Sequence, residues 1–222
     1  MGKIVSHLWD ITFSSDYWDE FARAVPRSLS RVPMLGSTSS PEKFIFEWSV
    51  GNDIVGDCVC PWGHTEIIIR KALGLEIARE FAGIKTIPAE ALGVPRKKGE
   101  RKKLSAPIEF IGLWPTHWAS YDEKLSTVER REGVAGIMLK TIVGAQIMEP
   151  DRKVYPAIHR LVEKPRIPGK GLFVHAADIE GFDVFRLMQF PGRLVCTDKF
   201  RDFFVSKNVN NVIFLEIGDV LR

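Results

Sequence analysis

Cysteine is scarce in this chain of 222 residues, which contains three: Cys58, Cys60 and Cys196. Three is an odd number and too few for a framework of disulfides, because a small scaffold stapled in that way needs paired cysteines. A low and uneven count favours a reducing compartment. The core must therefore be held by packing, and a chain of this length can bury enough surface to do so.

Long hydrophobic runs are also missing. The longest apolar stretch, 133–148, is interrupted by a lysine and a glutamine and is shorter than the about 20 residues that a membrane helix needs. The first residues, "MGKIVSHLWDITF", lack the continuous apolar run of a secretory signal. We therefore expect a cytoplasmic protein without a membrane partner.

Recognisable catalytic motifs are absent too. The sequence contains neither the G-x-S-x-G elbow of α/β-hydrolases nor a P-loop, in which a Lys-Ser/Thr pair follows spaced glycines. His64, His117, His159 and His175 are scattered and form no spaced pair. We expect a protein that is not an enzyme and needs no cofactor, with no catalytic residue assigned.

The stretch "CVCPWGH" at 58–64 is the strongest candidate for a metal site. Structural zinc sites usually pair cysteines as C-x₂₋₄-C, because the intervening turn lets both sulfurs reach one ion. Cys58 and Cys60 are separated by one residue and would instead point to the same face of a strand. We predict a strand and a Pro-Trp-Gly turn with no bound metal; a metal-dependent enzyme using Cys58, Cys60 and His64 is the alternative.

Positive charge is concentrated in one segment. The net charge is +3, yet "RKKGERKK" at 96–103 alone carries six basic residues and one acidic residue. Such a run is usually a solvated loop, and this one has no interleaved aromatic residue to stack on bases. We read 96–106 as a basic linker within a single domain of residues 1–222, with a subdivision into 1–95 and 107–222 as the alternative. Nucleic-acid binding through 96–103 is the alternative function.

Two stretches share a strand–helix–strand plan. In 67–92, three isoleucines predict a buried strand, and Leu73, Ile77 and Phe81 lie on one face of a helix. In 194–221, a short strand precedes Thr197 at an N-cap position, a Phe-rich helix follows, and "VIFLEI" predicts a last strand. This order, without regular βαβ alternation, predicts an α+β fold of mixed sheets and short helices, with two similar strand–helix–strand units.

Three further elements are expected outside these units. Apolar residues at helical spacing predict a helix within 14–29 that Pro26 ends, and alternating aromatic residues predict a strand over 43–50. The segment 108–133 predicts a strand, an aromatic turn and a short helix ending near Gly133.

The C-terminal part of the chain carries a recognisable pattern. It has an I-P-G loop at 167–169 and the "DVFRL" stretch at 183–187. Thr197 then begins a helix with Phe200 and Phe204, and a final strand "VIFLE" covers 212–216.

This pattern resembles a bacterial family of immunity proteins encoded beside polymorphic toxins, best over residues 158–217. A related group carries two CxxCG motifs that this chain lacks, so no metal site is carried over. The resemblance implies an immunity protein that binds a cognate toxin and occludes its active site, without a cofactor or a catalytic residue.

The family pattern transfers no toxin-contacting residue to this chain. The aromatic stretch 113–123 offers candidates, because aromatic residues are enriched at interface hot spots, although core packing is the competing interpretation. We therefore take Trp114, Trp118, Asp122 and Glu123 as candidate partner-binding residues.

Overall fold

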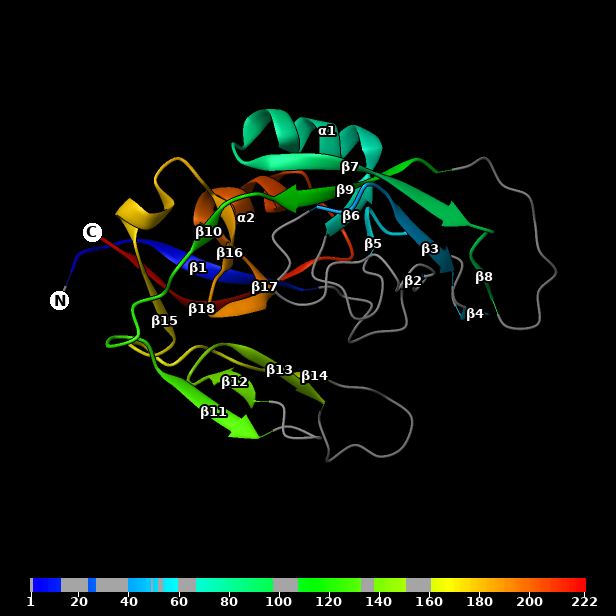
Figure 1. Ribbon diagram of the computed structural model, residues 1–222. Coiled ribbons are helices and arrows are strands. Elements are labelled where there is room, and N and C mark those ends of the chain that lie inside the picture. The colour runs from blue at the N-terminus through cyan, green and yellow to red at the C-terminus, as the bar shows by residue number, and fades with distance from the viewer. Residues whose placement is uncertain are drawn as a thin grey trace.

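Two six-stranded sheets organise the molecule (Figure 1). The computed structural model describes residues 2–12, 24–26, 40–48, 50–51, 54–59, 67–97, 108–132, 138–150 and 161–222. Sheet A has the order β10 (Trp118–Ala119), β16 (Val184–Leu187), β17 (Phe190–Thr197), β1 (Ile4–Thr12), β18 (Ile213–Leu221) and β15 (Leu172–His175). Sheet B has the order β2 (Ala24–Pro26), β3 (Phe44–Trp48), β7 (Ile84–Leu92), β9 (Phe110–Pro115), β6 (Ile67–Arg70) and β5 (Cys58–Val59).

The other described elements are helices and short ladders. The α-helices are α1 (Lys71–Glu80) and α2 (Asp198–Ser206), and η3 (Ala176–Ile179) is a 3₁₀ turn. The two-stranded ladders pair β4 (Val50–Gly51) with β8 (Arg96–Lys97), β11 (Val128–Glu132) with β12 (Met138–Ile142), and β13 (Ile147–Pro150) with β14 (Leu161–Lys164). The fold is α+β, as the sequence predicts, and strands predominate over helices among the described residues. Among the described residues, no helix is long and apolar enough to cross a membrane.

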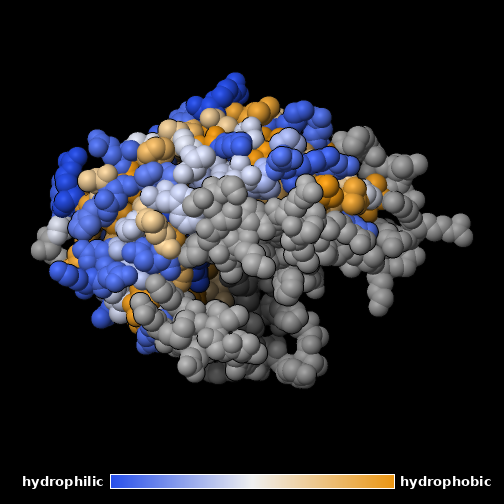
Figure 2. All heavy atoms as spheres, in the orientation of Figure 1, coloured by the Kyte–Doolittle hydropathy of each residue, from blue (hydrophilic) through white to orange (hydrophobic). Residues whose placement is uncertain are grey.

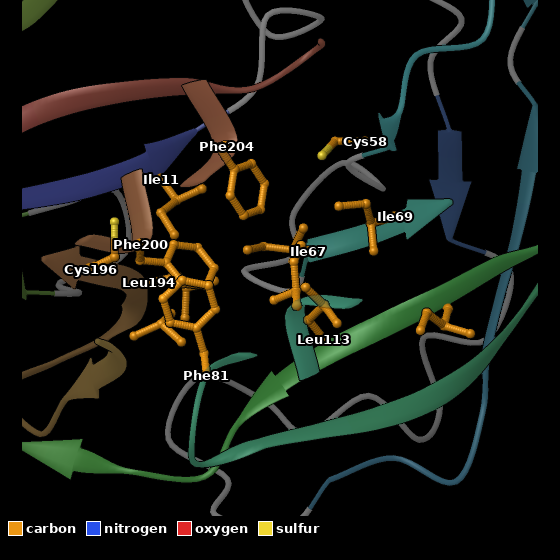
Figure 3. Packing of buried hydrophobic residues seen from close by; sticks show 13 residues of the cluster. Ile11, Cys58, Ile67, Ile69, Phe81, Leu113, Leu194, Cys196, Phe200 and Phe204 are labelled. Atoms are coloured by element: carbon orange, nitrogen blue, oxygen red, sulfur yellow. The ribbon is translucent and has the colours of Figure 1, made fainter. Parts of the chain in front are cut away.

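A central cluster of buried side chains joins the two sheets (Figure 3). Helix α1 contributes Ile77, helix α2 contributes Phe200 and Phe204, and Phe81 follows α1. The rings of Phe81 and Phe200 lie 4.9 Å apart at a steep angle, the edge-to-face arrangement that aromatic pairs favour. The strands contribute Ile11, Cys58, Ile67, Ile69, Ile111, Leu113, Val184, Leu194 and Cys196.

Each sheet has a second buried cluster on its outer face. On sheet B, Phe44, Phe46 and Trp48 alternate into this cluster along β3, which confirms the strand expected there. On sheet A, Leu8, Val174, Tyr121 and other residues form the equivalent cluster. β6 and β16 are buried on both faces, and for this reason their sequences are almost continuously apolar.

The chain termini meet at one end of sheet A (Figure 1). β1 lies between β17 and β18 and is antiparallel to both. The amide of Lys3 donates to the carbonyl of Arg222 at 3.2 Å, and the amide of Arg222 donates to that of Lys3 at 2.9 Å. The sheets thus do not follow a division into 1–95 and 107–222, because β1 lies in sheet A and β9 lies in sheet B.

Two expected helices are wrong in the part that the structure describes. Within 14–29, residues 24–26 form strand β2 paired with β3, and the remainder lies outside the described residues. The segment before Gly133 forms a turn at 123–126 and then strand β11, not a helix. Asp122 satisfies the amides of this turn locally, and pairing with β12 overrides the weaker helical tendency of the charged residues that follow.

Thr197 precedes α2 as expected, but its side chain does not cap the helix. Its hydroxyl donates to Asp183 Oδ1 at 2.7 Å. The first amide of α2, that of Asp198, instead donates to the hydroxyl of Ser6 on β1, at 3.1 Å. The cap is therefore supplied by a residue distant in sequence.

Candidate functional site

The aromatic segment 117–123 runs from β10, at one edge of sheet A, to β15, at the other edge, where the amide of Asp122 donates to the carbonyl of Phe173 at 2.7 Å. β10 pairs in parallel with β16, so Trp118 lies on an edge strand. The amide of Arg186 donates to the carbonyl of His117 at 3.0 Å, and the amide of Met188 donates to that of Ala119 at 3.0 Å. Backbone pairing therefore fixes the position of the candidate residues.

Trp114 and Trp118 are brought together by an arginine that the sequence interpretation did not single out. The guanidinium carbon of Arg186 lies 4.2 Å from the ring centroid of Trp114 and 5.9 Å from that of Trp118. Such cation–π contacts are strongest where water is excluded, and Arg186 is only 3% exposed. Trp114 is also 3% exposed, so a partner would reach Trp118 but not Trp114. The sequence does contain a sign of this contact, because an arginine within the apolar stretch "VFRL" indicates a buried charge that needs a partner.

Asp122 stabilises the turn that follows it. Its carboxylate lies 3.0 Å from His175 Nε2 and accepts the amides of Leu125 at 3.1 Å and Lys124 at 2.8 Å. The contact with His175 and these amides hold the pKa of Asp122 below its usual value. Glu123 is exposed and is the freer of the two carboxylates to meet a partner.

Further acidic side chains lie beside this segment. His117 Nε2 lies 2.7 Å from the carbonyl oxygen of Asp178 in η3, and Glu180 follows, with both acidic residues exposed. Met188, next to β10, is 64% exposed. We call Trp118, Asp122, Glu123, Asp178, Glu180 and Met188 the 117–123 surface. At the end of the molecule with the termini, the face in Figure 2 is mostly hydrophilic, with small separate hydrophobic areas.

The described cysteines do not form a reactive or metal-binding pair. Cys58 and Cys196 are both buried and lie at opposite sides of the central cluster (Figure 3). Burial, reinforced by the nearby charge of Asp10, raises the pKa of the Cys196 thiol well above its usual value, which keeps it protonated and unreactive. Cys58 lies in strand β5 as predicted, whereas Cys60 and His64 lie outside the described residues.

His7, Glu216 and Asp219 place potential ligand atoms within 4.8 Å of one another. Arg166 already occupies this cluster: Nη1 donates to Glu216 at 2.9 Å and to Asp219 at 2.7 Å, and Nη2 donates to Asp219 at 2.5 Å. Its side chain is 5% exposed and that of Asp219 is 3% exposed. A buried guanidinium compensates the two carboxylates, so the cluster is an ion-pair network and not a cation site.

A groove of about 890 Å³ lies on sheet B beside the start of α1. Its lining is mainly apolar and comes from β3, β7, β9 and the residues around them. Both of its lysines are paired, Lys43 with Glu90 and Lys71 with Glu109. The lining thus offers apolar contact and no uncompensated lysine. Sequence inspection missed this groove because its walls come from segments far apart in the chain.

Asp198 links helix α2 to strand β1. Its carboxylate accepts the amide of His7 at 2.8 Å, the indole of Trp9 at 2.8 Å and the hydroxyl of Ser6 at 3.0 Å. Partial burial alone would raise the pKa of Asp198, but these hydrogen bonds outweigh it and lower the pKa below the usual value of 3.8.

This lowered pKa predicts a pH-dependent contribution to stability. A carboxyl with a lower pKa in the folded chain stabilises the fold above its unfolded pKa of 3.8, and this contribution is lost as the pH falls through the folded pKa. Asp198→Asn should lower the free energy of unfolding by about 1–2 kcal/mol at pH 7, and the deficit should shrink below about pH 4. Urea unfolding of both chains at pH 7 and pH 3 measures it. Asp202→Asn, an exposed carboxylate on the same helix, should show no such change; an equal Asp198→Asn deficit at both pH values would contradict the assignment.

No protein-family model matches this chain, and no curated protein matches its sequence.

Proposed function

We propose that this chain is an immunity protein that binds a cognate toxin of the same cell and occludes its active site. The C-terminal sequence resemblance supports this class of function. The observation behind the choice of surface is that 117–123 pairs with segments of 173–188, so that this part of the molecule presents Trp118, the exposed Met188 and the exposed Glu123, Asp178 and Glu180.

The chemistry of the 117–123 surface fits a cationic partner. Aromatic residues and methionine are enriched at the centres of interfaces, where Trp118 and Met188 would supply apolar contact. Asp122, Glu123 and Asp178 would supply negative charge at the rim, which speeds association with a basic surface. Binding through such a surface needs no catalytic residue and no cofactor.

The first test is capture followed by rescue. The tagged full chain is used to capture partners from the source cells at moderate salt, with and without nuclease. The captured protein's C-terminal domain is then produced in a host with or without this chain. Growth restored only by the chain supports the proposal. Recovery of nucleic acid, or of partners lost after nuclease, would contradict it and favour binding through the basic run 96–103.

Charge reversal at Glu123 tests the surface itself. Glu123→Lys should weaken the complex about tenfold or more, because it places a positive charge against the cationic face of the partner. Glu42→Lys is the matched control, since Glu42 is also exposed but precedes β3 of sheet B. Titration calorimetry measures both affinities. Equal affinities for Glu123→Lys and the parent would exclude this surface. Asp122 is a poorer choice for reversal, because its carboxylate also holds the turn at 123–126.

A further inference from the structure

The two sheets contain the same arrangement of five strands. Sheet B contains β3-β7-β9-β6-β5, and sheet A contains β15-β18-β1-β17-β16. The central strands, β9 and β1, are antiparallel to both of their neighbours. At one end, β3 and β15 are parallel to the strand beside them. At the other end, β5 and β16 are antiparallel to the strand beside them. In both, one helix connects the two strands that flank the central strand.

The equivalence extends to the register of individual residues. Matching Ile69 of β6 to Cys196 of β17 aligns the ladders that β6 and β17 form with their neighbours. The ladders of β7 and β18 agree at Ala89 and Gly218, and a bulge between Leu8 and Trp9 then shifts β18 by one residue. The aligned residues that face or pack against the central cluster are Cys58 with Val184, Ile67 with Leu194, Ile69 with Cys196, Ile111 with Trp9, and Leu113 with Ile11. Those in the outer clusters are Val59 with Phe185, Ile68 with Val195, Phe110 with Leu8, Phe44 with Leu172, and Phe46 with Val174.

The helices begin at the same register position. α1 starts directly after Arg70, which pairs with Phe110, and α2 starts directly after Thr197, which pairs with Leu8. Leu73 and Ile77 of α1 correspond to Phe200 and Phe204 of α2, and all four lie in or against the central cluster.

The first helical residue makes a similar side-chain contact in both halves, with the acidic residue directly before the central strand in the first half and on the helix in the second. Lys71 Nζ lies 3.3 Å from Glu109, the residue before Phe110. Asp198 Oδ2 lies 3.2 Å from His7 Nδ1, the residue before Leu8. Agreement in strand order, register, burial face and this contact is too detailed to follow from a shared fold class alone.

We infer that the chain is a closed tandem of two equivalent units, in which β1 is the last strand of the second unit. The first unit is β3, β5, β6, α1, β7 and β9 in chain order. The second is β15, β16, β17, α2 and β18, followed by β1, whose place in the order corresponds to that of β9. The backbone pairing of Lys3 with Arg222 puts the end of β18 beside the start of β1, as a hairpin would.

A pair of circular permutants that contain residues 3–222 tests this inference. In both, Arg222 is joined to Lys3 through Asn-Gly, the two-residue turn that suits a hairpin. The unit permutant is opened between β1 and β2, which makes both units continuous. The control permutant is opened between Asn208 and Val209, which separates α2 from β18 inside the second unit.

The unit permutant should keep the circular dichroism spectrum of the parent and a Tm within about 5 °C of it, or higher, because only the connection between units is cut. The control permutant should lose more than about 10 °C, since the crossover that docks α2 is broken. Each permutant is also made with a six-residue Gly-Ser join. A loss of stability caused by the Asn-Gly turn can then be distinguished from one caused by the position of the new termini. Failure of the unit permutant to fold with both joins, or equal Tm values for the two permutants, would overturn the inference.

Discussion

Replacing Arg166 with alanine should lower the free energy of unfolding by about 3–5 kcal/mol, because it leaves the buried carboxylate of Asp219 without its counter-charge. The Asp219 side chain is 3% exposed, and both of its oxygens accept hydrogen bonds from Arg166. Arg166 also donates to the carbonyl oxygens of Gly218 at 3.0 Å and Lys170 at 2.8 Å. Its loss would therefore release the I-P-G loop from β18. Urea unfolding followed by tryptophan fluorescence measures the change.

The matched control is Lys43→Ala in sheet B. Lys43 pairs with Glu90, which corresponds in register to Asp219, but both side chains are about half exposed. An exposed ion pair contributes less than about 1 kcal/mol, so this substitution should have a small effect. If Arg166→Ala costs no more than Lys43→Ala, the network around Asp219 does not anchor the loop.

Replacing Phe200 with alanine should cost a similar amount, about 3–5 kcal/mol, through the cavity that it leaves. Phe200 is fully buried between the two sheets and contacts Phe81 and Phe204, with ring centroids 4.9 Å away in each case. Because Phe81 follows α1 and Phe204 belongs to α2, the cavity would loosen the contact between the two units. Thermal and urea unfolding measure the loss.

Val205 provides the control on the same helix. It is 56% exposed, so Val205→Ala should change the free energy of unfolding by less than about 0.5 kcal/mol. Phe200→Leu should recover part of the loss, since it refills some of the cavity. A Phe200→Ala chain as stable as the Val205→Ala chain would show that the central cluster does not hold the two sheets together.

The position of β1 has a consequence for folding. β1 precedes the other described strands in the chain, whereas its neighbours β17 and β18 follow them. Sheet A is thus completed only after β18 has been synthesised, and the contacts that close it join residues about 200 positions apart. Contacts of such long range slow folding, because loop closure must precede the favourable pairing.

Local patterns were sufficient to predict much of the architecture. The apolar run Ile67–Ile69 and the spacing of Leu73, Ile77 and Phe81 predicted a strand and a helix that the structure contains. The aromatic alternation in β3 was equally informative. After α2, Asn208 and Asn211 have positive φ values of 51° and 57°, a conformation that asparagine tolerates better than most residues. In each case, the local conformation is determined by residues that are close together in the sequence.

Predictions failed where a distant partner determined the conformation. Residues 24–26 pair with β3 in sheet B, although the spacing of apolar residues around them predicts a helix. Thr197 lies at the N-cap position of α2, but its hydroxyl donates a hydrogen bond to Asp183. The hydroxyl of Ser6 instead accepts the first amide of the helix. The candidate residue Trp114 is buried against Arg186, a contact that spans two different sheets.

The sequence by itself determined the strand–helix–strand units, the α+β class and the set of candidate residues, because hydrophobic periodicity and turn chemistry act over a few neighbouring positions. Only the tertiary structure decided that β1 completes the second unit, that Arg166 neutralises Asp219, and that 117–123 packs beside η3. These pairings join residues far apart in the chain. Their energies depend on burial and on geometry between elements, which periodicity along one element does not contain.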